Sequence, residues 1–444
     1  MRSITAKLHT VLIRIIIIVL MLFMVSIGLR IVTRHVLIDR LGMDNAFTRY
    51  VFRDKPKLFI PDLQVAAGER ARRGDGFMNK LEVTYWQYTT FVNRITNKLD
   101  TYMNEELVFR RPILEAANAY EKAIGWNLAG HSEYNNVIEL QADYLILFSN
   151  WTDMGANTEA ILEFKEYLDG QALPLLFVQP PGKVSKQDTV VNNVVDFYND
   201  NADRLVGSLR DNGVNTLDLR EQIEQQRLNH NSLFYNTDHH WRTEVGLWAA
   251  GEIGQELNRN FGFGFDPALF SPENYAFDIH KKAFLGSLGR KVTLARATLD
   301  DFVLIYPKFP VDLTLKIPSI ELDITGGFDI IYDYSQLEIE DLYESDPYGM
   351  YMHSALTDHG LTQLTNNLAQ GDVHKILVLG DSYINVVVPF LALGVNQIDI
   401  VDLRVYLGSL REWIQANSYD MVIIAYSAFF PVEYESGFSM YDFR

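Results

Sequence analysis

Short apolar runs alternate with helix-patterned segments in two separate parts of the chain, and this alternation constrains the fold more than any other feature. Such runs are typical of buried strands, and a strand, helix, strand order favours a parallel sheet. The predicted strands are 144–148, 173–178, 215–219, 375–379, 398–401 and 421–425, and the predicted helices are 158–168, 194–212, 243–257 and 407–416. The sequence therefore predicts an α/β fold, a parallel sheet with helices on both faces.

The stretch between these two parts has a different character. From 260 to 371 the chain is punctuated by glycine and proline, with strand-like runs at 302–306, 313–317 and 328–332, which is typical of a β-rich insertion. The predicted domains are 1–40 (an N-terminal transmembrane anchor), 41–141 (a helical connector), 142–259 (the first half of the α/β domain), 260–371 (the insertion) and 372–444 (the second half).

The N-terminus carries the longest apolar segment of the chain. Nearly every residue from Leu12 to Val32 is apolar, with Arg14 and Arg30 near the ends. At about 1.5 Å per residue these residues span roughly 31 Å as a helix, enough for a bilayer core if both arginines reach the interfaces. A cleavable signal peptide is the rival interpretation, but the small-x-small cleavage pattern is poor. We expect a single-pass anchor in a bacterial cell membrane, with the bulk of the chain extracytoplasmic.

Composition excludes several classes of function. The formal net charge is -18 and no cysteine is present. A chain this acidic has no basic surface to neutralise a phosphate backbone, so we do not expect nucleic-acid binding. Without cysteine, disulfides, thiolate catalysis and cysteine metal sites are excluded.

Two short segments carry residues suited to nucleophilic chemistry. The first, 235–241, contains Asp238 and His240, and the second, 380–383, contains Ser382 after an apolar strand. A serine becomes a useful nucleophile when an imidazole takes its proton and a carboxylate orients that imidazole. In a tight turn the Ser382 hydroxyl would project above the sheet, with its own N–H available to an oxyanion. Only the fold can close the gap of 142 residues (382 minus 240).

Each of these residues also has a structural interpretation. Gly-Asp-Ser after a strand is a common strand-ending turn, and Asp238 could cap the helix that follows it. Asp238, His239 and His240 together could ligate a metal. Because no further ligand such as a His-x-x-x-His is visible nearby, we predict no metal and no other cofactor.

The order of the two motifs resembles a known family. TDHHW at 237–241 followed by GDSY at 380–383 is similar to the bacterial DHHW family and to the SGNH-hydrolase-like proteins of alginate O-acetylation, the AlgJ and AlgX type. In those proteins the acid and base precede the serine, whereas most SGNH esterases have the serine first. The resemblance covers roughly 143–427 and implies an SGNH-hydrolase-like, flavodoxin-like fold. It implies Ser382 as nucleophile, His240 as base and Asp238 as the orienting acid, with His239 at the variable position.

Further segments extend the resemblance. The loop 178–183 is similar to a Pro-x-x-Lys loop, and 284–290 resembles a Gly-Ser segment of DHHW proteins. SGNH hydrolases place a glycine and an asparagine in the oxyanion hole. The oxyanion or substrate candidates in this chain are Gly394, Asn396, Asn385, Lys183, Trp241 and Tyr383.

The resemblance implies an extracytoplasmic O-acetyltransferase that modifies a cell-surface or secreted polysaccharide through an acetyl-Ser382 intermediate. It also implies a partner, a multi-spanning membrane acyltransferase that supplies acetyl groups outside the membrane. Two alternatives stay open. An extracytoplasmic carbohydrate or acyl esterase would use the same triad, whereas a non-catalytic envelope protein that binds glycan or scaffolds a complex would not need Ser382.

Overall fold

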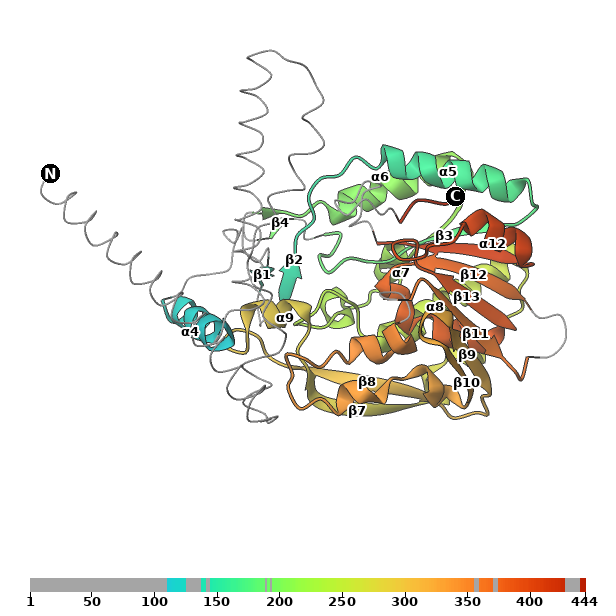
Figure 1. The fold of residues 1–444 in the computed structure, drawn as a ribbon. Helices are drawn as coiled ribbons and strands as arrows, with labels where there is room; N and C mark the ends of the chain where they lie inside the picture. The colour runs from blue at the N-terminus through green and yellow to red at the C-terminus, as the bar shows by residue number, and fades with distance from the viewer. Residues whose placement is uncertain are drawn as a thin grey trace, which may run out of the picture. The chain divides into compact units, whose positions relative to one another are not determined.

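The computed structural model describes residues 110–124, 137–140, 144–187, 190–191, 194–354, 359–369, 374–427 and 440–444 (Figure 1). The chain divides into two compact units, Met1–Ala117 and Asn118–Arg444. Helix α4 (Arg110–Ala123) contains all described residues of the first unit. The predicted membrane helix, 12–32, and most of the predicted connector, 41–141, lie outside the described residues. No described helix combines the length and the apolar character needed to cross a bilayer.

A mixed sheet of eight strands forms the centre of the second unit. Its order is β10-β9-β11-β13-β12-β14-β3-β6. The strands are β3 (Leu175–Gln179), β6 (Asn215–Asp218), β9 (Leu313–Ile317), β10 (Leu322–Gly326), β11 (Leu361–Asn366), β12 (Lys375–Gly380), β13 (Gln397–Val401) and β14 (Met421–Ala425). The five strands from β13 to β6 are parallel, as predicted.

The prediction of a purely parallel sheet is wrong at one edge. Strands β9, β10 and β11 come from the region 260–371 and join the sheet antiparallel. Only the short 3₁₀ helix η7 (Pro318–Ile320) and Glu321 connect β9 to β10. So short a connection allows only antiparallel neighbours, since a parallel crossover needs a dozen residues or more.

Helices cover both faces of the sheet, which confirms that part of the prediction (Figure 1). Leu175 and Phe177 of β3 pack into one core, whereas Leu176 and Val178 pack into another. The first core is closed by α5 (Gly155–Asp169), α6 (Tyr198–Asp211) and α12 (Leu410–Ala416), and the second by α7 (Leu219–Gln225), α8 (Thr243–Phe261) and α11 (Val388–Leu391). Successive side chains of a strand point to opposite faces, and both faces are covered, so β3, β12 and β14 consist mostly of apolar residues.

Among the residues that the structure describes, three two-stranded antiparallel pairs lie outside the main sheet. They are β1 (Val137–Glu139) with β2 (Leu145–Leu147), β4 (Val190–Val191) with β5 (Val194–Val195), and β7 (Tyr275–Phe284) with β8 (Asp300–Pro307). The run 144–148 is therefore not a strand of the parallel sheet, contrary to expectation. Instead, the Leu145 N–H donates to the carbonyl of Asn236 (2.9 Å), so β2 supports the loop that carries the Asp-x-His motif.

Two other predicted elements differ from the structure. Residues 328–332 were expected to be a strand, but Phe328–Ile331 forms the 3₁₀ helix η8, in which Phe328 and Ile331 are both buried. A spacing of three residues puts both side chains on one face of a helical turn, whereas a strand would separate them.

Helix α6 was expected to begin at 194, but it begins at Tyr198. The carboxylate of Asp196 accepts the N–H of Tyr198 at this start (3.0 Å). The remaining short helices are α9 (Ser287–Val292) and η4 (His230–Leu233), η5 (Pro267–Phe270), η6 (Pro272–Asn274), η9 (Tyr334–Leu337), η10 (Tyr348–Met350), η11 (Met352–Ser354), η12 (Ser382–Val386) and η13 (Ala392–Gly394).

A glycine brings the two motif-bearing elements together. Helix α8 follows the Asp-x-His motif, and η12 carries Ser382. A Cβ built on Gly246 of α8 would lie 2.1 Å from the carbonyl oxygen of Val386 in η12. Only glycine allows so close an approach of the two backbones, and the approach places the two motifs side by side.

Candidate active site

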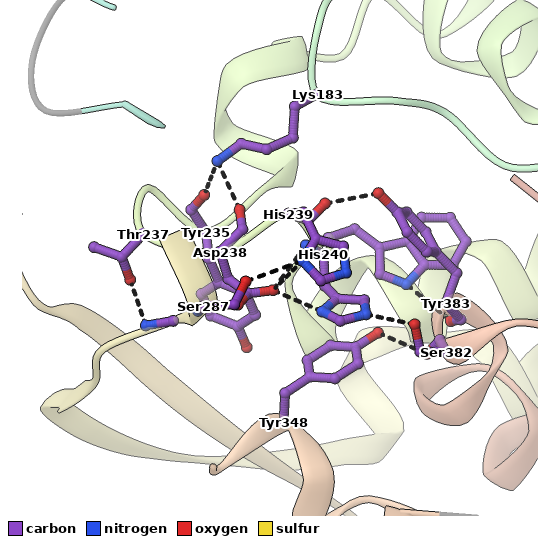
Figure 2. Close-up of polar contacts among 12 residues, drawn as sticks. Lys183, Tyr235, Thr237, Asp238, His239, His240, Ser287, Tyr348, Ser382 and Tyr383 are labelled. Carbon is purple, nitrogen blue, oxygen red and sulfur yellow. Dashed lines mark hydrogen bonds and ion pairs between the residues drawn. The ribbon is translucent and has the colours of Figure 1, made fainter. Parts of the chain in front are cut away.

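Asp238, His240 and Ser382 form a hydrogen-bonded chain (Figure 2). Nδ1 of His240 lies 2.6 Å from Oδ1 of Asp238, and Nε2 lies 2.6 Å from Oγ of Ser382. The fold thus closes the gap of 142 residues between base and serine. Asp238 is buried, whereas Ser382 is partly exposed. The arrangement can pass a proton from the serine hydroxyl to an imidazole that the carboxylate orients.

Ser382 lies at the carboxyl end of two neighbouring parallel strands. It follows Asp381, which caps η12 by accepting the N–H of Tyr383 (3.0 Å). The second oxygen of Asp381 accepts the N–H (2.7 Å) and the hydroxyl (2.6 Å) of Ser427, the second residue after β14. The N–H of Ser382 makes no hydrogen bond with the residues that the structure describes. It is therefore free to face an oxyanion.

The Asp-x-His loop is held by buried polar groups on both sides. The carboxylate of Asp300 accepts the N–H of Asn236 (2.8 Å) and the N–H (2.8 Å) and hydroxyl (2.6 Å) of Thr237. The ammonium of Lys183 donates to the carbonyls of Tyr235 (2.6 Å), Asn236 (3.2 Å) and Asp238 (2.7 Å). Lys183 is 4% exposed and its donors face the backbone, so the prediction that it contacts substrate or oxyanion is wrong. It holds the loop in shape.

Trp241 and Tyr383 join the loop to η12. The indole N–H of Trp241 donates to the carbonyl of Tyr383 (3.0 Å), and the hydroxyl of Tyr383 donates to the carbonyl of His239 (2.6 Å). Both side chains are buried. They position the acid and base relative to the serine and do not face a substrate, contrary to their prediction as substrate candidates.

Asp238 is kept ionised by its surroundings. Burial alone would raise the pKa of its carboxyl, but the nearby His239 and His240 and hydrogen bonds from His240 and Ser287 hold that pKa well below its ordinary value. The N–H of Ser287 donates to Oδ2 (2.6 Å), and a Cβ on the preceding Gly286 would lie 2.3 Å from Cβ of Asp238. Gly286 therefore lets this backbone donor approach the carboxylate.

Two of the oxyanion predictions are wrong. Gly394 and Asn396 precede β13, and the Asn396 N–H donates to the carbonyl of His374, which precedes β12. Because β12 and β13 are parallel, both residues lie at the amino ends of the strands, whereas Ser382 follows the carboxyl end of β12. Asn385 does share η12 with Ser382, three residues along. It is 2% exposed, and its Oδ1 has no partner among the described residues.

Two further side chains complete the site. The ring of Tyr348 stacks on His240, with centroids 4.0 Å apart and planes 13° apart, and its hydroxyl donates to the carbonyl of Ser382 (3.3 Å). The hydroxyl of Ser287 lies 3.1 Å from Nδ1 of His239. The Gly-Ser segment 284–290 gave a sequence signal for Ser287. Nothing distinguished Tyr348 among 23 tyrosines.

The acid and the two imidazoles also form a group of metal-ligand type. Ligand atoms of Asp238, His239 and His240 lie within 4.8 Å of one another. Both ring nitrogens of His240 already lie within hydrogen-bond distance, one of Asp238 and the other of Ser382. A metal ion bound here would compete with the Asp238–His240 hydrogen bond.

The lowered pKa of Lys183 allows a prediction of how the free energy of unfolding changes with pH. Burial lowers the pKa of its ammonium from 10.5 to about 7, against the opposing effect of Asp238 and Asp300. Between these values the unfolded chain binds a proton that the folded protein does not, so folding becomes more favourable as pH rises. The free energy of unfolding of the wild type minus that of Lys183→Met should rise by a few kcal/mol between pH 7 and about 10.

Urea unfolding of both proteins at several pH values measures this difference. Other groups that titrate in this window largely cancel in the subtraction. A difference that stays constant, or that falls as pH rises, would show that Lys183 is not held with a lowered pKa.

Comparison with known proteins confirms the resemblance. Residues 149–297 match the family model described as the SGNH hydrolase-like domain of the acetyltransferase AlgX. PatB1 of Bacillus cereus, solved with a sulfonyl adduct, has a TM-score of 0.52 at 18% identity and covers 69% of this chain and 99% of its own. A DHHW family protein of Eubacterium siraeum has a TM-score of 0.53 at 16% identity and covers 68% of this chain and 94% of its own. No curated protein sequence matches the chain. The SGNH-hydrolase-like α/β fold is thereby shown.

Proposed function

With residues 149–297 matching the SGNH hydrolase-like domain of the acetyltransferase AlgX, we propose that this protein transfers acetyl groups to a polysaccharide through an acetyl-Ser382 intermediate. The observation that carries the proposal is the chain of 2.6 Å contacts from Asp238 through His240 to Ser382. The sulfonyl adduct on PatB1 supports covalent chemistry in a protein of the same fold.

Acylation begins at the serine. Oγ of Ser382 attacks the carbonyl carbon of the acetyl donor while its proton passes to Nε2 of His240. Asp238 accepts the Nδ1–H and stabilises the imidazolium, because its carboxyl stays ionised. The oxyanion faces the N–H of Ser382. Asn385, three residues along the same helix, is the candidate for a second donor through its side-chain NH₂. His240 then protonates the leaving group, which leaves acetyl-Ser382.

Deacylation repeats these steps with a sugar hydroxyl. The hydroxyl oxygen attacks the acetyl carbon as His240 takes its proton, the bond to Oγ breaks, and the proton returns to Oγ. Water in place of the sugar would give hydrolysis with the same groups. The identity of the attacking hydroxyl therefore separates a transferase from an esterase.

The apolar N-terminal segment supports a proposal about where the reaction takes place. We place the site outside the cytoplasmic membrane, anchored by the apolar run 12–32. Acetyl-CoA is not available there, so the acetyl group would come from a multi-spanning membrane acyltransferase, and the acceptor would be a cell-surface or secreted polysaccharide.

The full-length protein in detergent, given 4-nitrophenyl acetate, tests the proposal. Acid quenching and peptide mass spectrometry should locate one acetyl group on Ser382. Added oligosaccharides should then receive acetyl groups faster than free acetate appears. An adduct that releases only acetate with every acceptor would identify an esterase. If neither the acetyl ester nor a sulfonyl fluoride labels the wild type, a non-catalytic scaffold is favoured.

A further inference from the structure

His239 is the imidazole of the motif whose second ring nitrogen makes no hydrogen bond with the residues that the structure describes. Its Nδ1 lies 3.1 Å from Oγ of Ser287 and 3.5 Å from Oδ1 of Asp238. Figure 2 draws no contact from Nε2. The side chain is 35% exposed, against 11% for His240. A partly exposed imidazole therefore lies within the catalytic cluster, and the proton transfers proposed above do not use its Nε2.

The geometry directs this nitrogen to the serine side of the cluster. Both imidazoles place Nδ1 near the same oxygen of Asp238, and their ring centroids are 3.8 Å apart with a tilt of 39°. Because Nδ1 and Nε2 lie on opposite sides of Cε1 in an imidazole, both Nε2 atoms point away from Asp238. Nε2 of His240 meets Oγ of Ser382 there. Nε2 of His239 is thus turned away from Asp238, on a ring that packs against the one that meets Ser382.

The groups around Nδ1 of His239 indicate which of its two ring nitrogens carries the proton. The Ser287 hydroxyl, 3.1 Å from Nδ1, can accept a hydrogen bond from it, and the negative charge of the Asp238 carboxylate 3.5 Å away favours the tautomer of a neutral ring with its proton on Nδ1. That leaves a lone pair on Nε2. Desolvation and the charge of a protonated His240 lower the pKa of His239 to about 3, so the ring stays neutral at ordinary pH. Nε2 is therefore a hydrogen-bond acceptor.

We propose that Nε2 of His239 accepts a hydrogen bond from a second hydroxyl of the acceptor, adjacent to the hydroxyl that His240 deprotonates. Two acceptor nitrogens on stacked rings suit the two neighbouring hydroxyls of a sugar, whereas water has a single oxygen. The acyl-enzyme therefore selects vicinal diols over water and over simple alcohols. This inference rests on the proposed acetyl-Ser382 intermediate.

Two matched acceptors test it on the full-length protein. The acetyl-enzyme is given equal concentrations of trans-1,2-cyclohexanediol or trans-2-methoxycyclohexanol, and acetyl ester is measured against free acetate. The methoxy compound keeps the attacking hydroxyl but cannot donate from its second oxygen. One neutral hydrogen bond predicts a preference for the diol of roughly 3- to 10-fold in the wild type.

Two variants locate the source of the preference. His239→Phe keeps a ring against His240 but removes both nitrogens. The preference, counted per attacking hydroxyl because the diol has two, should therefore fall to about 1. Ser287→Ala removes the hydroxyl near Nδ1 but leaves Nε2, so the preference should remain. The preference is a ratio of two rates measured on one protein, so it can be determined even in a variant that turns over slowly. If the Phe variant fails to fold, His239→Ala provides a second measurement.

The outcomes separate this inference from the proposed function. Absence of acetyl-Ser382 in the wild type would refute the proposed function itself. A wild-type adduct that shows no preference for the diol would overturn only the role of His239. The same follows if His239→Phe stays as selective as the wild type. Equal loss in the His239 and Ser287 variants would assign the selectivity to the Ser287 contact and not to Nε2.

Discussion

Replacing Ser382 with alanine is expected to lower turnover of an activated acetyl ester by about 10³- to 10⁶-fold. The substitution removes the oxygen that lies 2.6 Å from Nε2 of His240, so no acyl-enzyme can form at this position. Catalysis that survives would come from binding and from the oxyanion donors alone. Initial rates with 4-nitrophenyl acetate, together with the mass of the acid-quenched protein, measure both effects.

The fold should tolerate this change. Ser382 is partly exposed, and the loss of one hydroxyl should alter the free energy of unfolding by about 1 kcal/mol or less. A matched control is Ser319→Ala on the exposed helix η7, which should turn over at the wild-type rate. If Ser382→Ala retains wild-type turnover, the serine is not the nucleophile and the scaffold interpretation gains support.

Replacing Asp238 with asparagine is expected to lower turnover by about 10³- to 10⁴-fold at neutral pH. Two backbone donors, the N–H of His240 on Oδ1 and the N–H of Ser287 on Oδ2, each need an acceptor. An amide has only one oxygen, so its NH₂ must face one of them. If the shorter bond to Ser287 (2.6 Å) keeps the oxygen, the NH₂ faces His240 and favours the tautomer with its proton on Nε2. That tautomer cannot take the proton of Ser382.

A matched control is an Asp→Asn substitution at a helix N-cap outside the candidate site. Asp266 caps the short helix η5 by accepting the N–H of Ala268 (2.9 Å), and asparagine caps equally well. Asp266→Asn should leave turnover unchanged. If Asp238→Asn keeps more than about a tenth of wild-type turnover, the carboxylate does not orient the base, since a wrong tautomer costs far more. Adduct formation at Ser382 should slow in parallel with turnover.

Most of the central sheet could be predicted from sequence, because the strands at its centre, β3, β12 and β14, are buried on both faces. Such strands are apolar throughout and stand out against the helices between them. The antiparallel edge could not be predicted, since strand pairing depends on partners that periodicity does not reveal. Residues 328–331 illustrate a second limit. Four residues with apolar ends fit a strand or a 3₁₀ turn, and only the position of the core decides between them.

The candidate site shows the same division. The acid, base and serine could be named because their chemistry and their order along the chain are visible in sequence. The oxyanion predictions of Gly394 and Asn396 failed because residue type does not show which end of a strand a loop occupies. Lys183, Trp241 and Tyr383 lie in the cluster as expected, but they hold the backbone in place and do not face a substrate.

The sequence by itself determined the α/β class, the exclusion of thiol chemistry, and three residue types capable of serine chemistry. These follow from composition, periodicity and local motif, which do not depend on distant contacts. Only the tertiary structure decided that His240 meets Ser382, that Tyr348 stacks on the base, and that the indole N–H of Trp241 donates to the carbonyl of Tyr383. Each of these depends on two segments far apart in the chain meeting at one edge of the sheet, where the close approach of Gly246 to Val386 brings them within hydrogen-bond distance.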